Sequence, residues 1–100
     1  MGKRVKLAPN IFSYPDFEHF ELHMEISLGG GINKEDIVLK MNDTGFFLQA
    51  PRDDFDYVTS MALCCPVKAS EAKAQFENGI LKVVVPFKDR MEDAVQIQVM

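Results

Sequence analysis

The stretch AKAQFENGILKVVVPF, residues 72–87, decides the fold class of this chain. Asn78-Gly79 separates its two halves: apolar and polar residues alternate in the first, and the second is almost wholly apolar. Asn followed by Gly suits a type I′ turn, because both central residues of that turn need a positive φ angle. The sequence therefore predicts a tight hairpin whose first strand borders solvent and whose second strand is covered on both faces.

A second segment, residues 20–28 (FELHMEISL), has an apolar residue at every second position. This period is typical of a half-buried strand. No long stretch of the chain carries a helical period. Further segments with strand-like composition lie at residues 10–14, 37–41, 46–50, 57–65 and 95–99. We expect an all-β fold, an antiparallel β-sandwich of about seven to eight short strands.

Length and charge exclude several classes of function. The chain has 100 residues, which predicts one domain, and its formal net charge is −4. A nucleic-acid-binding protein needs a basic face, so we expect no nucleic-acid partner. No apolar run approaches the roughly 18 residues that a membrane helix requires, and the N-terminus lacks the apolar stretch of a signal peptide. We therefore expect a cytoplasmic protein with no membrane partner.

The sequence offers little support for catalysis. It contains no nucleophile elbow and no P-loop pattern, so we expect no enzyme activity and no catalytic residues. Glu21, His23 and Glu25 share a predicted strand face that could in principle hold a metal ion. We favour a solvated face, since no thiolate or third histidine completes a site, and we expect neither metal nor cofactor. A small metal or redox protein, built on the histidines and Cys64-Cys65, is the least favoured alternative.

The hairpin also carries a family resemblance. Residues 74–81 (AQFENGIL) resemble the A-x-x-x-N-G-V-L signature of the alpha-crystallin domain of small heat-shock proteins. The matching positions of this signature hairpin are Ala74, Asn78, Gly79, Ile80 and Leu81. Residues 28–37 resemble the family's L-P-G-V-K-K-E-D-I step, and residues 95–99 (VQIQV) are similar to the I-x-I tail that such proteins place in a partner's groove. The resemblance covers about residues 12–99 and implies an immunoglobulin-like sandwich.

The resemblance implies a division of the chain and a binding site. The division is a short N-terminal extension at 1–9, an alpha-crystallin-like domain at 10–88, and a C-terminal linker with its V-x-I-x-V segment at 89–100. A groove for peptides or clients is expected between the strands at 37–41 and 72–77. Its expected residues are Ile37, Leu39, Met41, Ala74 and Phe76, and the expected docking residues of the C-terminal segment are Val95, Ile97 and Val99. Segment 95–99 is equally compatible with a last strand of the domain's own sheet, and both alternatives stay open.

The function that the resemblance implies is an ATP-independent chaperone, which binds exposed apolar or extended segments of non-native proteins and limits their aggregation. The alternative is a CS-type adaptor or co-chaperone domain that docks one folded partner. The expected partners are non-native clients or a chaperone partner, and further copies of this chain through edge strands or the C-terminal segment. At the position of residues 51–56, the family has a longer loop, and a strand in that loop is exchanged between the two protomers of a dimer. Six residues are too few to leave the domain, pair with a neighbour and return. We therefore expect no strand-exchanged dimer.

Overall fold

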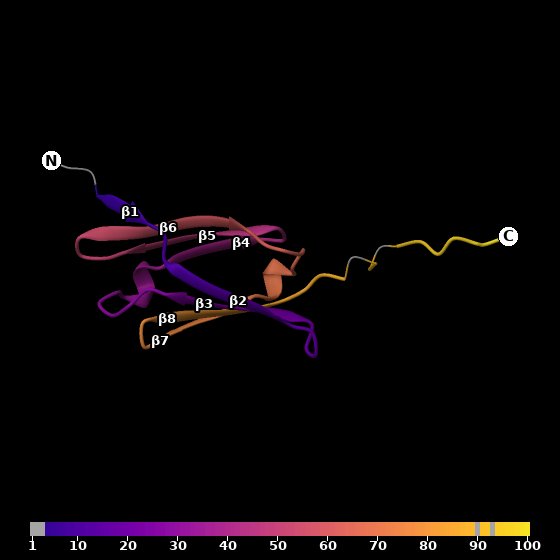
Figure 1. Cartoon of the computed structure of the whole chain (residues 1–100), viewed down its shortest axis with the longest axis horizontal. Helices are drawn as coiled ribbons and strands as arrows, with labels where there is room; N and C mark the ends of the chain where they lie inside the picture. Colours follow the sequence, from indigo (N-terminus) through magenta and orange to yellow (C-terminus); the bar gives the residue numbers. More distant parts are fainter. Residues whose placement is uncertain (1–3, 90, 93) are drawn as a thin grey trace.

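The chain folds as two β-sheets that pack face to face (Figure 1). The computed structural model describes residues 4–89, 91–92 and 94–100, and these contain eight β-strands. Residues 1–3 of the expected N-terminal extension and residues 90 and 93 of the expected linker lie outside the described residues.

Each sheet has four strands. The order in sheet A is β1 (Val5–Leu7), β6 (Phe55–Ala62), β5 (Gly45–Pro51) and β4 (Val38–Asn42). The order in sheet B is β2 (Asn10–Asp16), β3 (Glu21–Ser27), β8 (Ile80–Pro86) and β7 (Lys73–Glu77). Neighbouring strands run antiparallel, except that β1 runs parallel to β6. The all-β sandwich predicted from the sequence is confirmed.

Two single-turn 3-10 helices connect strands at the edges of the sandwich. They are η1 (Lys34–Asp36), which leads into β4, and η2 (Ala69–Glu71), which leads into β7. Among the described residues, no helix combines the length and apolar character needed to cross a membrane.

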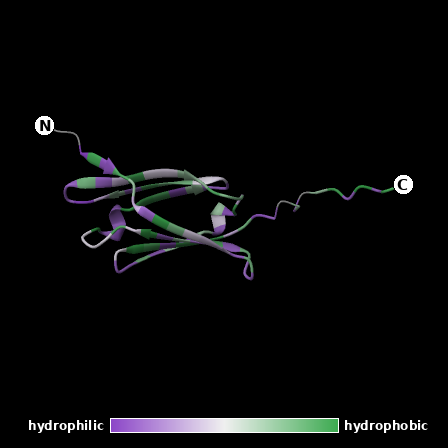
Figure 2. Ribbon diagram, viewed as in Figure 1, coloured by the Kyte–Doolittle hydropathy of each residue, from purple (hydrophilic) through white to green (hydrophobic). Residues whose placement is uncertain are grey.

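The core lies between the sheets and is made by the inward-facing residues of their central strands. Across β3 and β8 the buried pairs are Leu22 with Val85, Met24 with Val83, and Ile26 with Leu81. From the opposite sheet, β5 contributes Phe46, Leu48 and Ala50. Figure 2 shows the alternation of hydrophobic and hydrophilic residues along the strands. Each large side chain in this layer adds about 1.5–3 kcal/mol of transfer free energy, so the alternation holds the two sheets together.

The expectation that the second strand of the hairpin is covered on both faces is wrong. On the outer face of β8, Lys82 is exposed and Val84 is only half-buried. The reason is that the sandwich has two layers, so the outer face of β8 has no third layer over it. Val84 instead lies between its cross-strand neighbours His23 and Lys73.

Strand β1 is a feature that the sequence did not predict. It pairs over three residues with the first residues of β6, from Val5 opposite Phe55 to Leu7 opposite Tyr57. Arg4 fixes its start, because the guanidinium forms an ion pair of 2.9 Å with Asp56 and donates to the backbone carbonyl of Phe55 at 3.0 Å. A three-residue strand is too short to show a period, which is why the alternation pattern gave no signal for it.

The hairpin turn has the predicted geometry and a second role. Asn78 and Gly79 have φ angles of 52° and 77°, so both central residues are left-handed as a type I′ turn requires. The Gly79 carbonyl oxygen accepts hydrogen bonds of 2.9 Å from the amides of Leu28 and Gly29, which ties the turn to the end of β3. A Cβ atom at Gly79 would lie 2.8 Å from the carbonyl carbon of Gly29, so this close approach requires glycine.

We predict that Gly79→Val lowers the free energy of unfolding by about 2–4 kcal/mol, because a β-branched residue resists positive φ and its side chain collides with backbone. Urea denaturation measures the loss. The matched control is Gly30→Val, because Gly30 is exposed and a Cβ atom there meets no atom within 4 Å. Equal losses in the two variants would contradict the role assigned to Gly79.

Candidate functional site

Two strand edges of the sandwich border a groove. In the described part of the chain, β4 pairs only with β5 and β7 pairs only with β8, so each ends its sheet. The outward N–H and C=O groups of such edge strands are open to pairing with an added strand. The groove between these edges has a volume of about 640 Å³.

The β4 side of the groove follows from the alternation of that strand. Leu39 and Met41 are half-buried on the groove side, whereas Val38 and Lys40 are exposed on the other face. Ile37 precedes the strand, and its amide donates to the Lys34 carbonyl oxygen at 3.2 Å in η1. The turn of η1 therefore directs Ile37 into line with the two alternate residues of β4.

Strand β7 lines the second side of the groove, and β8 forms its floor. Phe76 is half-buried and Ala74 exposed on β7, and the buried side chains of Leu81 and Val83 lie beneath them. The charged residues that line the groove are Lys34, Glu35 and Lys73. An apolar floor with charged sides suits an extended apolar segment whose backbone pairs with an edge strand.

The structure thus brings together the five groove residues expected from the sequence: Ile37, Leu39, Met41, Ala74 and Phe76. What binds there stays a prediction. Sequence reasoning missed Val83 as part of the floor and the small residues of the η2 turn, Ala69 and Ala72, which also line the groove. The alternation along β8 places Val83 on the same face as Leu81, and that signal was available in the sequence.

The expected docking segment does not lie in this groove. Residues 94–100 form no strand, and Figure 1 shows the yellow C-terminal end running away from both sheets. Val95, Ile97 and Val99 are 84%, 81% and 93% exposed. In this structure the segment is therefore not a last strand of the domain's own sheet, and its three apolar side chains are unburied.

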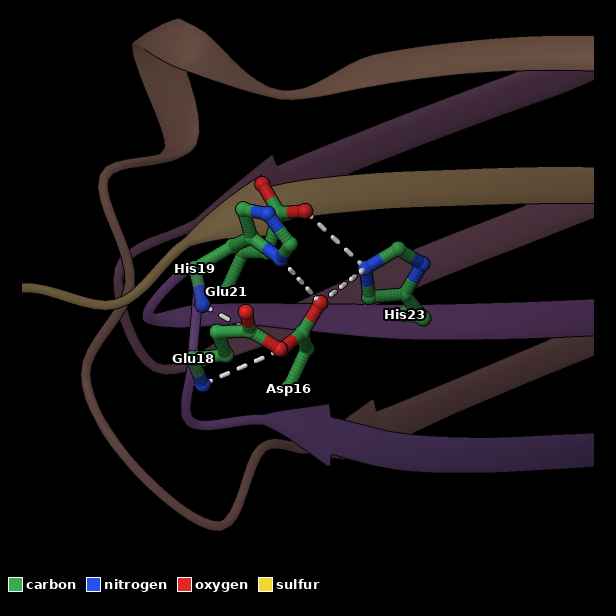
Figure 3. Close-up of polar contacts among 5 residues, drawn as sticks. All are labelled: Asp16, Glu18, His19, Glu21 and His23. Atoms are coloured by element: carbon green, nitrogen blue, oxygen red, sulfur yellow. Dashed lines mark hydrogen bonds and ion pairs between the residues drawn. The ribbon is translucent and has the colours of Figure 1, made fainter.

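A polar cluster lies at the other end of sheet B, where β2 turns into β3 (Figure 3). The hydrogen bond from the His19 side chain holds the pKa of the Asp16 carboxyl below its usual range, and the same contact raises the pKa of the His19 imidazole. His23 contacts Glu21 at 3.0 Å. The sequence places Glu21, His23 and Glu25 together as possible metal ligands on one strand face. In the structure, the residue that joins Glu21 and His23 is Asp16. Asp16 comes from the neighbouring strand, which strand periodicity alone does not reveal.

The sequence matches no protein-family model and no curated protein. Solved structures of several other proteins are similar to the structure of this chain. Heat shock protein 16.0 from Schizosaccharomyces pombe superposes with a TM-score of 0.74 at 17% identity, over 95% of this chain and 77% of that protein. A small heat-shock protein from Xylella fastidiosa gives 0.72 at 16% identity, over 94% of this chain and 97% of the other.

A mutant of hsp14.1 from Sulfolobus solfatataricus superposes with a TM-score of 0.69 at 22% identity, over 81% of this chain and 76% of that one. These similarities agree with the resemblance carried by the hairpin signature. At such low identities they establish the architecture. The chain therefore has the fold of the small heat-shock proteins, the alpha-crystallin-type β-sandwich.

Proposed function

We propose that this chain is an ATP-independent chaperone that binds extended apolar segments of non-native proteins and thereby limits their aggregation. The observation that carries the proposal is the groove between β4 and β7, which joins alternate apolar side chains to two strand edges that no described strand covers. The similarity to small heat-shock proteins supports it. The adaptor alternative gains no support from the named structures.

The mechanism is binding without covalent chemistry. An extended client segment adds to the edge of β4 or β7 by backbone hydrogen bonds, which are independent of its sequence. Every second side chain of the segment then enters the groove, since alternate residues of a strand lie about 6.8 Å apart on one face. Such binding lowers the concentration of exposed segments and so opposes aggregation by mass action.

The C-terminal segment has the chemistry of an occupant for the same groove. Val95, Ile97 and Val99 alternate with two glutamines, and all three apolar side chains are unburied in the structure. Residues 88–94 connect the segment to the end of the sandwich. We infer that it docks in the groove of another copy of the chain, where it links copies and competes with clients.

Replacing Leu39 by aspartate tests the groove. We predict that Leu39→Asp weakens client binding at least about tenfold, because an apolar segment that binds in the groove would strip water from the new carboxylate. The measurement is light scattering from reduced insulin as it aggregates, at increasing concentrations of chain.

Val38→Asp is the matched control for that test, because it makes the same change on the opposite, exposed side of β4. The melting temperatures of both variants establish that they fold. Full protection by folded Leu39→Asp, or equal loss in the two variants, would contradict the proposal.

A second prediction concerns the docking segment. If Ile97 docks in a partner's groove, Ile97→Ala weakens association of the chain by about 2 kcal/mol or more. The melting temperature barely changes, because Ile97 is 81% exposed in the single chain. Size-exclusion chromatography with light scattering measures the association. A fall of several degrees in melting temperature with unchanged assembly would contradict docking between chains.

A further inference from the structure

The cluster at the turn between β2 and β3 is not part of the groove. Strand register places Asp16 directly opposite Glu21 and Tyr14 directly opposite His23, so these four side chains share the outer face of sheet B. The side chains of Asp16, Glu21 and His23 are 26%, 28% and 24% exposed, which makes them half-buried. His19, in the turn, reaches back to the same carboxylate (Figure 3).

The cluster brings together two negative charges that a bound cation would neutralise. Asp16 and Glu21 are like charges in directly opposite positions, an arrangement that destabilises a strand pair. On its other side Glu21 lies opposite Pro86, which offers no positive charge. Glu25, two residues along the same face, lies opposite Lys82 and so has a counter-charge on the next strand. In the described part of the chain, the two imidazoles are the groups that form ion pairs with the carboxylates at positions 16 and 21, whereas Lys73 and Lys82 line the same hollow as Glu21 without pairing with it.

The donor atoms have the spacing of a metal site. Asp16 Oδ2 lies 2.8 Å from His19 Nδ1 and 3.7 Å from His23 Nε2, and Glu21 Oε1 lies 3.0 Å from His23 Nε2. Ligands of a tetrahedral zinc ion lie about 3.4 Å from one another, as follows from metal–ligand distances of about 2.0–2.2 Å. The observed distances bracket that value, and the donor atoms of Asp16, Glu21 and His23 all lie within 4.8 Å of one another, so small side-chain rotations bring these three to a common centre. His19 is grouped with Asp16 and Glu18 instead, so its exposed side chain must turn further to join them.

The side chains that would bind the ion are already held in place. The ring of Tyr14 stacks on the ring of His23, with centroids 5.0 Å apart and an angle of 12° between the planes. Asp16 Oδ1 accepts the backbone amides of Glu18 and His19 at 3.1 and 3.2 Å. That anchoring leaves Oδ2 directed at the two imidazoles, and a preformed ligand set loses less conformational entropy when it binds.

We propose that Asp16, Glu21 and His23 bind a divalent transition-metal ion of the zinc class, with His19 as the fourth ligand. Imidazole nitrogen and carboxylate oxygen together suit Zn²⁺, whereas Mg²⁺ prefers oxygen ligands alone. The bound ion neutralises the opposed carboxylates and clamps the edge strand β2 to β3 at their turn. Both imidazoles bind as neutral rings, so uptake of the metal releases any protons they carry.

Isothermal titration calorimetry of the chain with zinc chloride tests the proposal. The titration uses the chain with Cys64→Ser and Cys65→Ser, because cysteine thiolates are themselves zinc ligands. We expect one ion per chain, and at least about a tenfold loss of affinity on changing Glu21→Gln or His23→Gln. Glu25→Gln on the same face is the matched control and should bind within about twofold of the parent.

Thermal unfolding gives a second, independent measurement. Zinc at about ten times its dissociation constant should raise the melting temperature by about 5 °C or more, and magnesium at the same concentration should not. If His23→Gln fails to fold, His19→Ala replaces it, since His19 is an exposed turn residue. The proposal is overturned by the absence of saturable binding, by equal effects of magnesium and zinc, or by equal losses in Glu21→Gln and Glu25→Gln.

Discussion

The register between β3 and β8 is the constraint on which the rest of the structure depends. It sets Leu22, Met24 and Ile26 against Val85, Val83 and Leu81 on the inner face of sheet B. A slip of one residue would turn this entire set to solvent. Gly79 locks the register from one end, because its carbonyl oxygen bonds the amides that close β3 and its φ angle is one that other residues resist.

The same register places both binding regions of the molecule. With Leu81 and Val83 facing inward, β8 supplies a floor beneath the opening between β4 and β7. With Glu21 and His23 facing outward, β3 presents them to Asp16 across the turn from β2. The two regions use opposite faces of one sheet, so a change in either should leave the other intact. The short connection from β5 to β6, residues 52–54, provides no segment long enough for exchange with a neighbour.

Much of the fold could be predicted from the sequence, because residues that are neighbours in the chain determine it. The alternation of residues 20–28 and the Asn78-Gly79 turn are properties of neighbouring residues, so the positions of the central strands and the geometry of the hairpin turn were predicted correctly. Two features that depend on distant residues were not predicted. β1 is held by Arg4 and Asp56, which are far apart in sequence, and Asp16 meets Glu21 and His23 only through the register of two strands.

The proposed function depends on the binding of extended apolar segments in the groove between β4 and β7. The most direct measurement is the change in amide chemical shifts of the isotope-labelled full-length chain carrying Ile97→Ala, on adding a peptide of residues 94–100. We expect saturable changes concentrated at residues 38–42 and 73–77, which form the two edges of the groove. Changes confined to β1 or β2, the other two edge strands, would contradict this expectation. The absence of any change at about 1 mM peptide would also contradict it, because a dissociation constant of about 1 mM corresponds to a binding free energy of only about −4 kcal/mol.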